Sequence, residues 1–370
     1  MFSELLSSLV EHHKKELPFV AYRKPKEEIV KAIFQEDSQV HYVKDFSESG
    51  FVFAPFDSQH KAILLPNTTT LEAKYIPNKA SDAMDKNSLV AIRSDKERHL
   101  NLVKKGISQI EQGKFKKVVL SRKLETTCKA EPTDLFQNLL NTYTNAFCYL
   151  WHHPQIGTWL GATPEILLKA ENLQFTTMSL AGTRQYIETK SPEWGTKELD
   201  EQQLVTDYIS KALVGVVSNL QTGERESVRA GNLWHLRTKL VGRMESGSLA
   251  KIIHALHPTP AICGMPMKAT KNFILENENY NRDYYTGFLG ELNFITGKDR
   301  SSNSRNQEHK AYRSVKNTST LFVNLRCMKL ENAIAHIYVG GGVTRDSEPE
   351  KEWKETVAKS NTILQALIEA

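Results

Sequence analysis

The first part of the chain, residues 1–95, alternates short apolar runs with stretches rich in Lys, Glu and Pro. Residues 51–56 and 62–65 have the length and the Val, Ile, Leu and Phe content of strands. No cluster of chemically reactive side chains stands out there. We therefore treat residues 1–95 as a variable N-terminal region, which we expect to pack on a core formed by residues 96–370.

The rest of the chain mixes strands and helices without a regular alternation. Apolar residues at helical spacing predict helices near residues 102–113, 197–214 and 348–368. Short β-type runs predict strands at residues 117–122, 147–151, 157–160, 166–168, 234–236, 321–330 and 333–339. Because helices join few of these strands in a βαβ rhythm, the pattern favours an α+β fold, with a large mixed or antiparallel sheet core flanked by helices.

Composition and charge narrow the class of protein. With 40% apolar and 25% charged residues, the chain is typical of soluble globular proteins. The 48 basic and 43 acidic side chains are mixed along it, and no groove-reading motif accompanies the short Lys pairs, so we expect no nucleic-acid partner. No apolar run approaches the roughly 18 residues of a membrane span. The four cysteines are widely spaced, which is typical of reduced thiols in a cytoplasmic protein.

Two of the predicted helices carry acidic residues in unusual places. Glu198 and Glu201 lie over the apolar stripe of the second helix, so they should point inward. Glu352, Glu355 and Lys359 share one face of the last helix. Inward carboxylates are costly unless they are paired or bind a cation, and carboxylate oxygens suit Mg²⁺. A solvated salt-bridged face, or an acidic first turn that matches the helix dipole, explains the same spacing.

Seven motifs, in a fixed order, resemble those of the chorismate-utilising (chorismate-binding) enzymes. They are Lys-Val-Val-Leu-Ser-Arg at 117–122, Gly-Ala-Thr-Pro-Glu at 161–165, Leu-Ala-Gly-Thr at 180–183, Lys-Glu-Leu-Asp-Glu at 197–201, His-Pro-Thr-Pro-Ala at 257–261, Leu-Arg-Cys at 325–327 with Gly-Gly-Gly-Val at 340–343, and Glu-Trp-Lys-Glu-Thr at 352–356 with Lys359. The resemblance covers roughly residues 98–365 and implies the fold of these enzymes.

The resemblance also implies a base and an acid. Lys117 corresponds to the general base that activates water for attack at C2 of chorismate, and Glu165 to the acid that protonates the leaving C4 hydroxyl. Both roles make sense if burial lowers the pKa of the lysine and raises that of the glutamate. Without the resemblance, Lys117 is equally a surface lysine at the start of a strand, Lys116 is an alternative base, and Glu165 is a loop carboxylate.

A magnesium ion and several substrate contacts follow from the same resemblance. Glu201 and Glu355 correspond to direct Mg²⁺ ligands, with Glu198 and Glu352 as supporting carboxylates, and the metal would hold the ring carboxylate of chorismate. The implied substrate-binding residues are Gly182, Thr183, His235, Arg326, Gly340, Gly342 and Lys359. Of these, an arginine suits a carboxylate by its forked geometry, whereas a lone histidine in a strand is also typical of a hydrogen-bonded core residue.

Two features bear on the reaction within the family. Ala181 stands where the enzymes that make aminodeoxychorismate have a lysine. Gln202 stands where many members have a histidine, a departure that leaves Glu201 in place and bears little on the reaction. The stretch 257–261, with Cys-Gly-Met-Pro at 263–266, resembles isochorismate synthases rather than anthranilate synthases. We therefore expect an isomerase, an isochorismate synthase that acts on chorismate as a monomer without a glutaminase subunit. A salicylate synthase, which also eliminates pyruvate, and an inactive chorismate-binding protein are the alternatives, and these residues do not distinguish menaquinone from siderophore biosynthesis.

Overall fold

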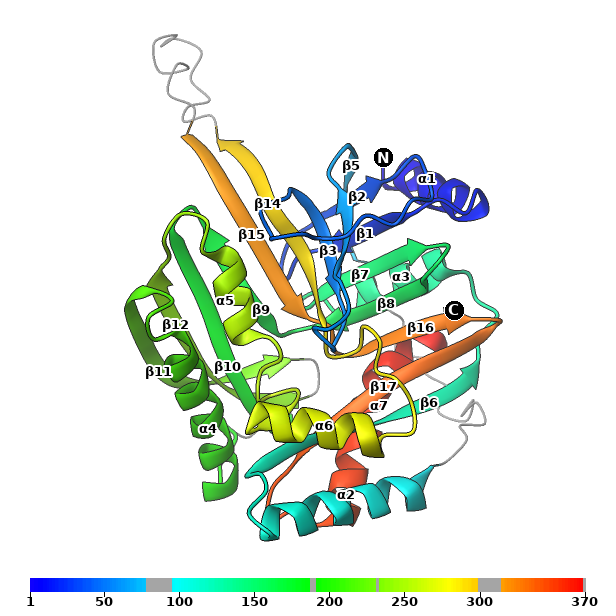
Figure 1. Ribbon diagram of the computed structural model, residues 1–370. Helices are drawn as coiled ribbons and strands as arrows, with labels where there is room; N and C mark the ends of the chain where they lie inside the picture. Colours follow the sequence, from blue (N-terminus) through cyan, green and yellow to red (C-terminus); the bar gives the residue numbers. More distant parts are fainter. Residues whose placement is uncertain (78–94, 187–190, 231–232, 299–313, 369–370) are drawn as a thin grey trace.

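The computed structural model describes residues 1–77, 95–186, 191–230, 233–298 and 314–368, and for a few of these only the backbone. These residues form two antiparallel β-sheets that lie face to face, with helices on their outer sides (Figure 1). The expected α+β fold, with a large antiparallel sheet core flanked by helices, is confirmed.

The larger sheet has nine strands among the described residues. In spatial order they are β13 (Gly264–Met265), β6 (Lys117–Thr127), β17 (Ile334–Val343), β16 (Cys327–Glu331), β8 (Gly157–Thr163), β7 (Phe147–His153), β1 (Phe19–Arg23), β2 (Ile29–Phe34) and β5 (Thr69–Lys74). The central strands β1 and β7 are buried along their whole length. This explains why their sequences are mostly apolar rather than alternating, with Arg23, His152 and His153 at the strand ends.

The smaller sheet has eight described strands. In spatial order they are β11 (Ser218–Ala230), β12 (Leu233–Arg243), β10 (Gln174–Gln185), β9 (Ile166–Glu171), β15 (Ser314–Val323), β14 (Phe288–Lys298), β3 (Gly50–Ala54) and β4 (Ile63–Pro66). Side chains of both sheets meet in a shared core that is rich in aromatic rings. Phe147 of the larger sheet stacks on Phe322 of the smaller one, with ring centroids 4.2 Å apart. The contact between the sheets is therefore largely aromatic.

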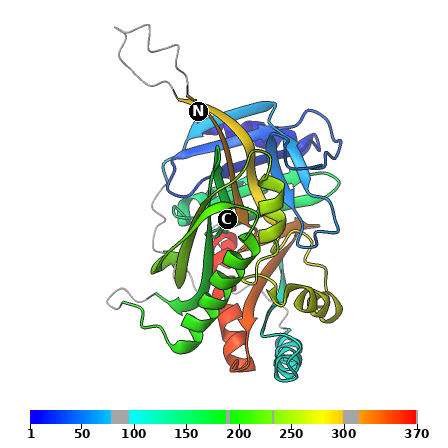
Figure 2. The same cartoon turned by 60° about the vertical axis from the view of Figure 1, so that its left-hand side comes forward.

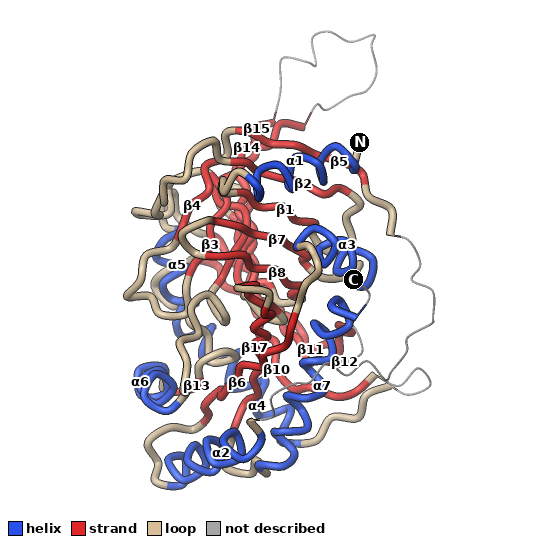
Figure 3. The backbone as a smooth tube through the Cα atoms, turned by 90° about the vertical axis from the view of Figure 1, so that its right-hand side faces the viewer, coloured by secondary structure: helices blue, strands red, loops and turns tan. Residues whose placement is uncertain are grey.

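Helices cover both outer faces (Figures 2 and 3). On the larger sheet lie α1 (Phe2–Lys14), α3 (Pro132–Thr142) and α7 (Pro349–Ile368). On the smaller sheet lie α4 (Thr196–Leu213) and α5 (Leu249–Leu256), while α2 (Lys96–Glu111) and α6 (Met267–Asn277) flank β6. The three predicted helices are thus α2, α4 and α7. Within the described residues, no helix is both long and apolar enough to span a membrane.

The N-terminal residues contribute strands to both sheets. β1 pairs with β7 in the larger sheet, and β3 pairs with β14 in the smaller one. Residues 1–77 therefore pack on the rest of the chain as integral strands. Residues 78–94 lie outside the described part of the structure. A domain boundary near residue 95 stays a prediction.

The predicted single strand at residues 321–330 is wrong. β15 ends at Val323 in the smaller sheet, and β16 begins at Cys327 in the larger sheet. Arg326, between them, has a φ of 48°, in the left-handed region that ends a strand. Apolar residues occur on both sides of Asn324 and Arg326, so the pattern of residues 321–330 does not reveal that the chain changes sheets.

Candidate active site

A cavity of about 160 Å³ draws its walls from both sheets and from helices α4 and α7. All but one of the predicted site residues line it: Lys117, Glu165, Gly182, Glu198, Glu201, His235, Arg326, Gly340, Gly342, Glu352, Glu355 and Lys359. The exception, Thr183, has its backbone in β10, but its side chain lies outside the described part of the structure. Residues up to 242 positions apart in the sequence, from Lys117 to Lys359, therefore meet at one cavity.

Lys117 enters the cavity from the start of β6. Its side chain is only 2% exposed, and its Nζ lies 2.7 Å from Oε1 of Glu201 on α4. A buried ammonium needs such a counter-charge. The neighbouring Lys116 is exposed and is not part of the cavity wall. The interpretation of Lys117 as a surface lysine is thus wrong. The assignment of Lys117 rather than Lys116 as the base stays a prediction.

Glu165 lies in the turn between β8 and β9 and is 6% exposed. Burial raises the pKa of its carboxyl to about 7, against the opposing effect of Lys117, Arg326 and Lys359. Its backbone is anchored, because its carbonyl accepts the N–H of Val323. Near neutral pH, this carboxyl group is therefore able to donate a proton into the cavity.

His235 orients Arg326. Its Nδ1 lies 3.0 Å from the carbonyl oxygen of Gly182, and its Nε2 lies 3.1 Å from Nη2 of Arg326. Burial, followed by the charges of Arg326 and Lys359, lowers the pKa of His235 to about 3. The ring is therefore neutral, so Nδ1–H donates to Gly182 and Nε2 accepts from Arg326. Gly182 has a φ of 72°, where β10 bulges to expose this carbonyl.

The four glutamates predicted to bind magnesium line the cavity in two groups. On α4, Glu201 pairs with Lys117, while Glu198 accepts the N–H of Gly195 at 2.9 Å. On α7, Glu352 is 3% exposed, and Glu355 lies 2.7 Å from Nζ of Lys359. Lys359 also donates to the carbonyl of Gly340 at 3.0 Å. Glu198 is thus also a capping residue at the start of its helix.

These carboxylates fit a magnesium ion by their chemistry, since Mg²⁺ takes one or two protein carboxylates and keeps several waters. In the described part of the chain, no three His, Cys, Asp or Glu side chains are close enough to enclose an ion by themselves. Gly342 makes room for the acids, because a Cβ there would lie 2.7 Å from Glu201 Oε1, whereas one at Gly341 would make an ordinary contact with Glu352 Oε2 at 3.5 Å. The glycine run therefore forms the wall that both acidic helices face.

Gln202, next to Glu201, anchors α4. It is completely buried, and its Nε2 lies within 3.0 Å of the hydroxyl oxygens of Ser179, Thr206 and Thr238. These contacts join α4 to β10 and β12 at the position that follows Glu201. The glutamine thus has a structural role that its position in the motif did not reveal.

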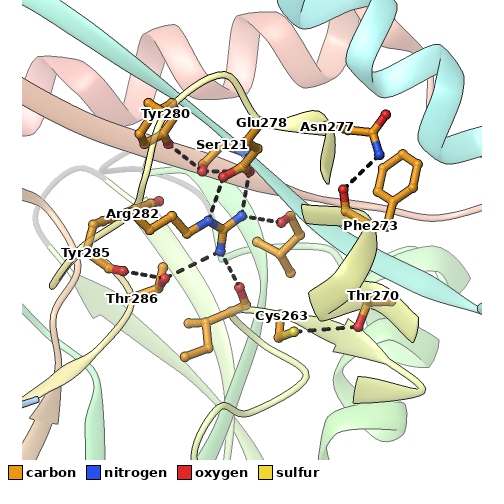
Figure 4. Close-up of polar contacts among 12 residues, drawn as sticks. Ser121, Cys263, Thr270, Phe273, Asn277, Glu278, Tyr280, Arg282, Tyr285 and Thr286 are labelled. Atoms are coloured by element: carbon orange, nitrogen blue, oxygen red, sulfur yellow. Dashed lines mark hydrogen bonds and ion pairs between the residues drawn. The ribbon is translucent and has the colours of Figure 1, made fainter. Parts of the chain in front are cut away.

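Several cavity residues were not predicted, among them Tyr285 and Thr286. They follow a segment held by Arg282, which forms an ion pair with Glu278 at 2.6 Å and donates to the carbonyl of Val119 at 2.7 Å (Figure 4). Glu278 in turn accepts the backbone N–H and the hydroxyl of Ser121 (Figure 4). No sequence pattern marks these residues, because they come together only through this buried network.

Comparisons with known proteins agree on a family. Residues 55–297 match one model described as a chorismate binding enzyme, and residues 311–365 match another. Isochorismate synthase DhbC of Bacillus subtilis is 28% identical over 73% of this chain and 68% of its own length. Isochorismate synthase EntC of Escherichia coli K12 is 30% identical over 67% of this chain and 61% of its own length. The match thus spans about two thirds of each relative.

The fold has a solved counterpart. The menaquinone-specific isochorismate synthase MenF of Escherichia coli aligns over 95% of this chain and 88% of its own, with a TM-score of 0.74 at 18% identity. One family model covers more than half of the chain, from a point inside the N-terminal region to β14. The chain belongs to the family of chorismate-binding enzymes.

Proposed function

We propose that this protein is an isochorismate synthase, which interconverts chorismate and isochorismate. The observation that carries the proposal is the placement of buried Lys117 and of Glu165, whose pKa is about 7, on the wall of one cavity. The names of the relatives DhbC and EntC support it. Ala181, in the same wall, offers no amine, which speaks against the formation of aminodeoxychorismate. Residues 257–261 resemble isochorismate synthases rather than anthranilate synthases, so water is the proposed nucleophile.

Lys117 is the proposed base. In its neutral form it takes a proton from a water molecule as the water oxygen bonds to C2 of the ring. Glu201 is its ion-pair partner, with Nζ and Oε1 2.7 Å apart.

Glu165 is the proposed acid. As the double bonds of the ring shift, the bond from C4 to oxygen breaks, and Glu165 gives its proton to the departing hydroxyl, which leaves as water. One water enters and one leaves, so the net reaction is an isomerisation. A proton passed from Lys117 back to Glu165 restores both groups. The reverse reaction uses the same two residues in exchanged roles.

The two carboxylates of chorismate have two cationic partners. Arg326, held by His235, presents its fork to the enolpyruvyl carboxylate. Lys359 lies on the same helix face as Glu355 and suits the ring carboxylate. Glu201 and Glu355, with Glu198 and Glu352 beside them, would hold a Mg²⁺ ion, which neutralises and orients that carboxylate.

The test is the product formed from chorismate. We expect the purified protein with Mg²⁺ to form isochorismate, detected by chromatography, and to catalyse the reverse reaction. Salicylate with pyruvate would establish the salicylate synthase alternative. Unchanged chorismate would support an inactive binding protein.

Two variants and one control locate the chemistry. Lys117→Ala and Glu165→Gln should each lower kcat by about 100-fold or more. Lys116→Ala removes the neighbouring, exposed lysine and should keep full activity. Full activity in Lys117→Ala would contradict the assignment of the base.

A further inference from the structure

A second, larger cavity of about 690 Å³ opens at the start of α2, on the edge of β6. Its wall includes the first turn of α2, Ser121 and Arg122 of β6, Asn277 at the end of α6 and Asn279 just beyond it. None of the described residues that line it belongs to the wall of the active-site cavity. β13 pairs with β6 only at Lys117 and Val118, and at Ser121 the backbone N–H donates to the side chain of Glu278, so among the described residues no strand pairs with this edge of β6 here.

Arg122 is the central feature of this cavity. It is only 5% exposed, its guanidinium carbon lies 4.1 Å from the centre of the Trp353 ring, and its Nε donates to Thr356 at 2.8 Å. Among the described residues, its two Nη nitrogens have no acceptor, and no carboxylate forms an ion pair with it. Burial lowers its pKa to about 10, against the opposing effect of Asp95, which acts on it without forming an ion pair. A buried cation without an ion-pair partner favours an anion from outside.

The start of α2 adds further donors. His99 is 3% exposed, and its Nδ1 has no hydrogen-bond partner in the described structure. Asp95, the N-cap residue, makes no side-chain cap, so the first N–H groups of this helix lack an acceptor of that kind. Arg98 and Lys105 are exposed at the rim. Helix N-termini with nearby cations attract anions.

Acidic residues are also present, and they do not cancel this charge. Asp95 and Glu97 line the cavity, but Lys96 is already paired with Glu350 of α7 at 3.0 Å. The remaining cations, Arg98, Lys105 and Arg122, therefore outnumber the two carboxylates of the cavity.

We propose that this cavity is a binding site for a small multivalent anion, a phosphate monoester or a polycarboxylate, with Arg122 as its principal contact and the start of α2 as its second. The site is separate from the one that takes chorismate. Arg122 contacts α7 at Trp353 and Thr356, each of which follows a predicted metal ligand, Glu352 or Glu355, by one position. A ligand here would thus bind the side chain that packs on the acidic helix, without entering the active site.

Calorimetric titration of the full chain in low-salt buffer tests the proposal, with inorganic phosphate and citrate as the two probes. We expect saturable binding of at least one, and the probe that binds identifies the class of anion. Arg122→Gln should weaken it by about 100-fold, and Lys105→Glu by about fivefold. Lys104→Glu makes the same charge change at an exposed position that does not line the cavity, and should leave the affinity unchanged.

A further variant separates this cavity from the active site. Arg326→Gln removes the buried cation of the chorismate cavity and should not affect the binding of either probe. If Arg122→Gln does not fold, the comparison of Lys105→Glu with Lys104→Glu decides whether the anion binds in this cavity. Absence of saturable binding, or binding that is lost in Arg326→Gln and kept in Lys105→Glu, would overturn the proposal. This readout does not depend on whether chorismate is converted.

Discussion

At the level of single residues, Glu165 shows how burial creates a functional group. Three cations, Lys117, Arg326 and Lys359, favour its ionised form, yet desolvation has the larger effect and raises its pKa to about 7. The same carboxyl on an exposed loop would ionise near pH 4.5. The raised pKa of Glu165 therefore depends on its burial in the folded chain and not on the sequence Pro164-Glu165 alone.

This raised pKa predicts a pH-dependent stability. A carboxyl whose pKa is higher in the folded chain binds its proton more tightly there, so its contribution is complete below about pH 4.5 and is lost as pH rises through about 7. From pH 5 to 8, the free energy of unfolding of the wild type should fall by on the order of 3 kcal/mol more than that of Glu165→Gln. Urea unfolding of both proteins across this pH range measures the difference in the free energy of unfolding. Parallel curves for the two proteins would contradict the prediction.

His235 is a positioning residue for Arg326. With a pKa of about 3, it stays neutral and keeps Nε2 as an acceptor for the guanidinium. His235→Leu should raise the KM for chorismate by about tenfold, with a smaller change in kcat, because Arg326 loses its orientation. His235→Gln retains an amide oxygen as an acceptor and should recover part of the affinity. Steady-state kinetics separates the two constants, and an effect on kcat alone would contradict this role.

At the level of elements, the register between β6 and β17 places the glycine run. Gly342 lies opposite Val119, and Gly340 opposite Ser121, so this part of β17 runs past the side of β6 that carries Lys117. The missing side chains leave space for carboxylates that come from α4 and α7. The glycines thus act by leaving space, a role not evident from a Gly-rich motif, which is also typical of a turn.

The two neighbouring glycines should respond differently to the same substitution. A Cβ at Gly342 would lie 2.7 Å from Oε1 of Glu201 and 3.0 Å from Cε of Lys117, so Gly342→Ala should displace the pair and lower kcat/KM by about 100-fold. Gly341→Ala is the matched control, because its Cβ would have ordinary contacts at 3.5 Å or more. Kinetics with chorismate compares them. Equal losses would mean that backbone freedom, rather than space, is what matters.

The buried pair of Glu278 and Arg282 joins α6 to β6 (Figure 4). Removal of one partner leaves an uncompensated charge, so Arg282→Gln should lower the free energy of unfolding by about 3–5 kcal/mol. The pair of Lys351 and Glu348 is a control, because both side chains are more than 60% exposed. Lys351→Gln should change stability by less than about 0.5 kcal/mol. Denaturant unfolding measures both, and similar values would contradict the structural role.

At the level of the whole molecule, the proposed metal site exists only when both helices are in place. Glu201 belongs to α4, which covers the smaller sheet, and Glu355 to α7, which covers the larger one. An ion held by both would tie the two layers together. Such an ion binds the folded state alone and stabilises it by mass action.

Magnesium should therefore raise the melting temperature of the wild type. At 100 times the dissociation constant we expect a shift of about 2 °C or more. Glu355→Gln should reduce this shift and the dependence of turnover on Mg²⁺. Glu348→Gln, an exposed glutamate outside the cavity, should keep both. Thermal unfolding with and without chelator measures the shift, and undiminished activity in chelator would contradict the metal site.

The local patterns of the chain predicted three of the described helices and many of the strands. Continuous apolar runs predicted β6 and β7, and helical spacing predicted α2, α4 and α7. The ordered motifs indicated the candidate site residues. The candidates whose side chains the structure describes line one cavity. This works because strand and helix periodicity, and the residue types that a reaction needs, are properties of short segments.

Only the tertiary structure decided how these segments meet. The break at Arg326 between the sheets, the ion pair of Lys117 with Glu201 and the high pKa of Glu165 all depend on contacts between distant residues. No local sequence pattern predicts the segment held by Arg282 or the cavity beside Arg122. Desolvation and charge pairing act through space, so they are determined by the packed chain and not by the order of residues along it.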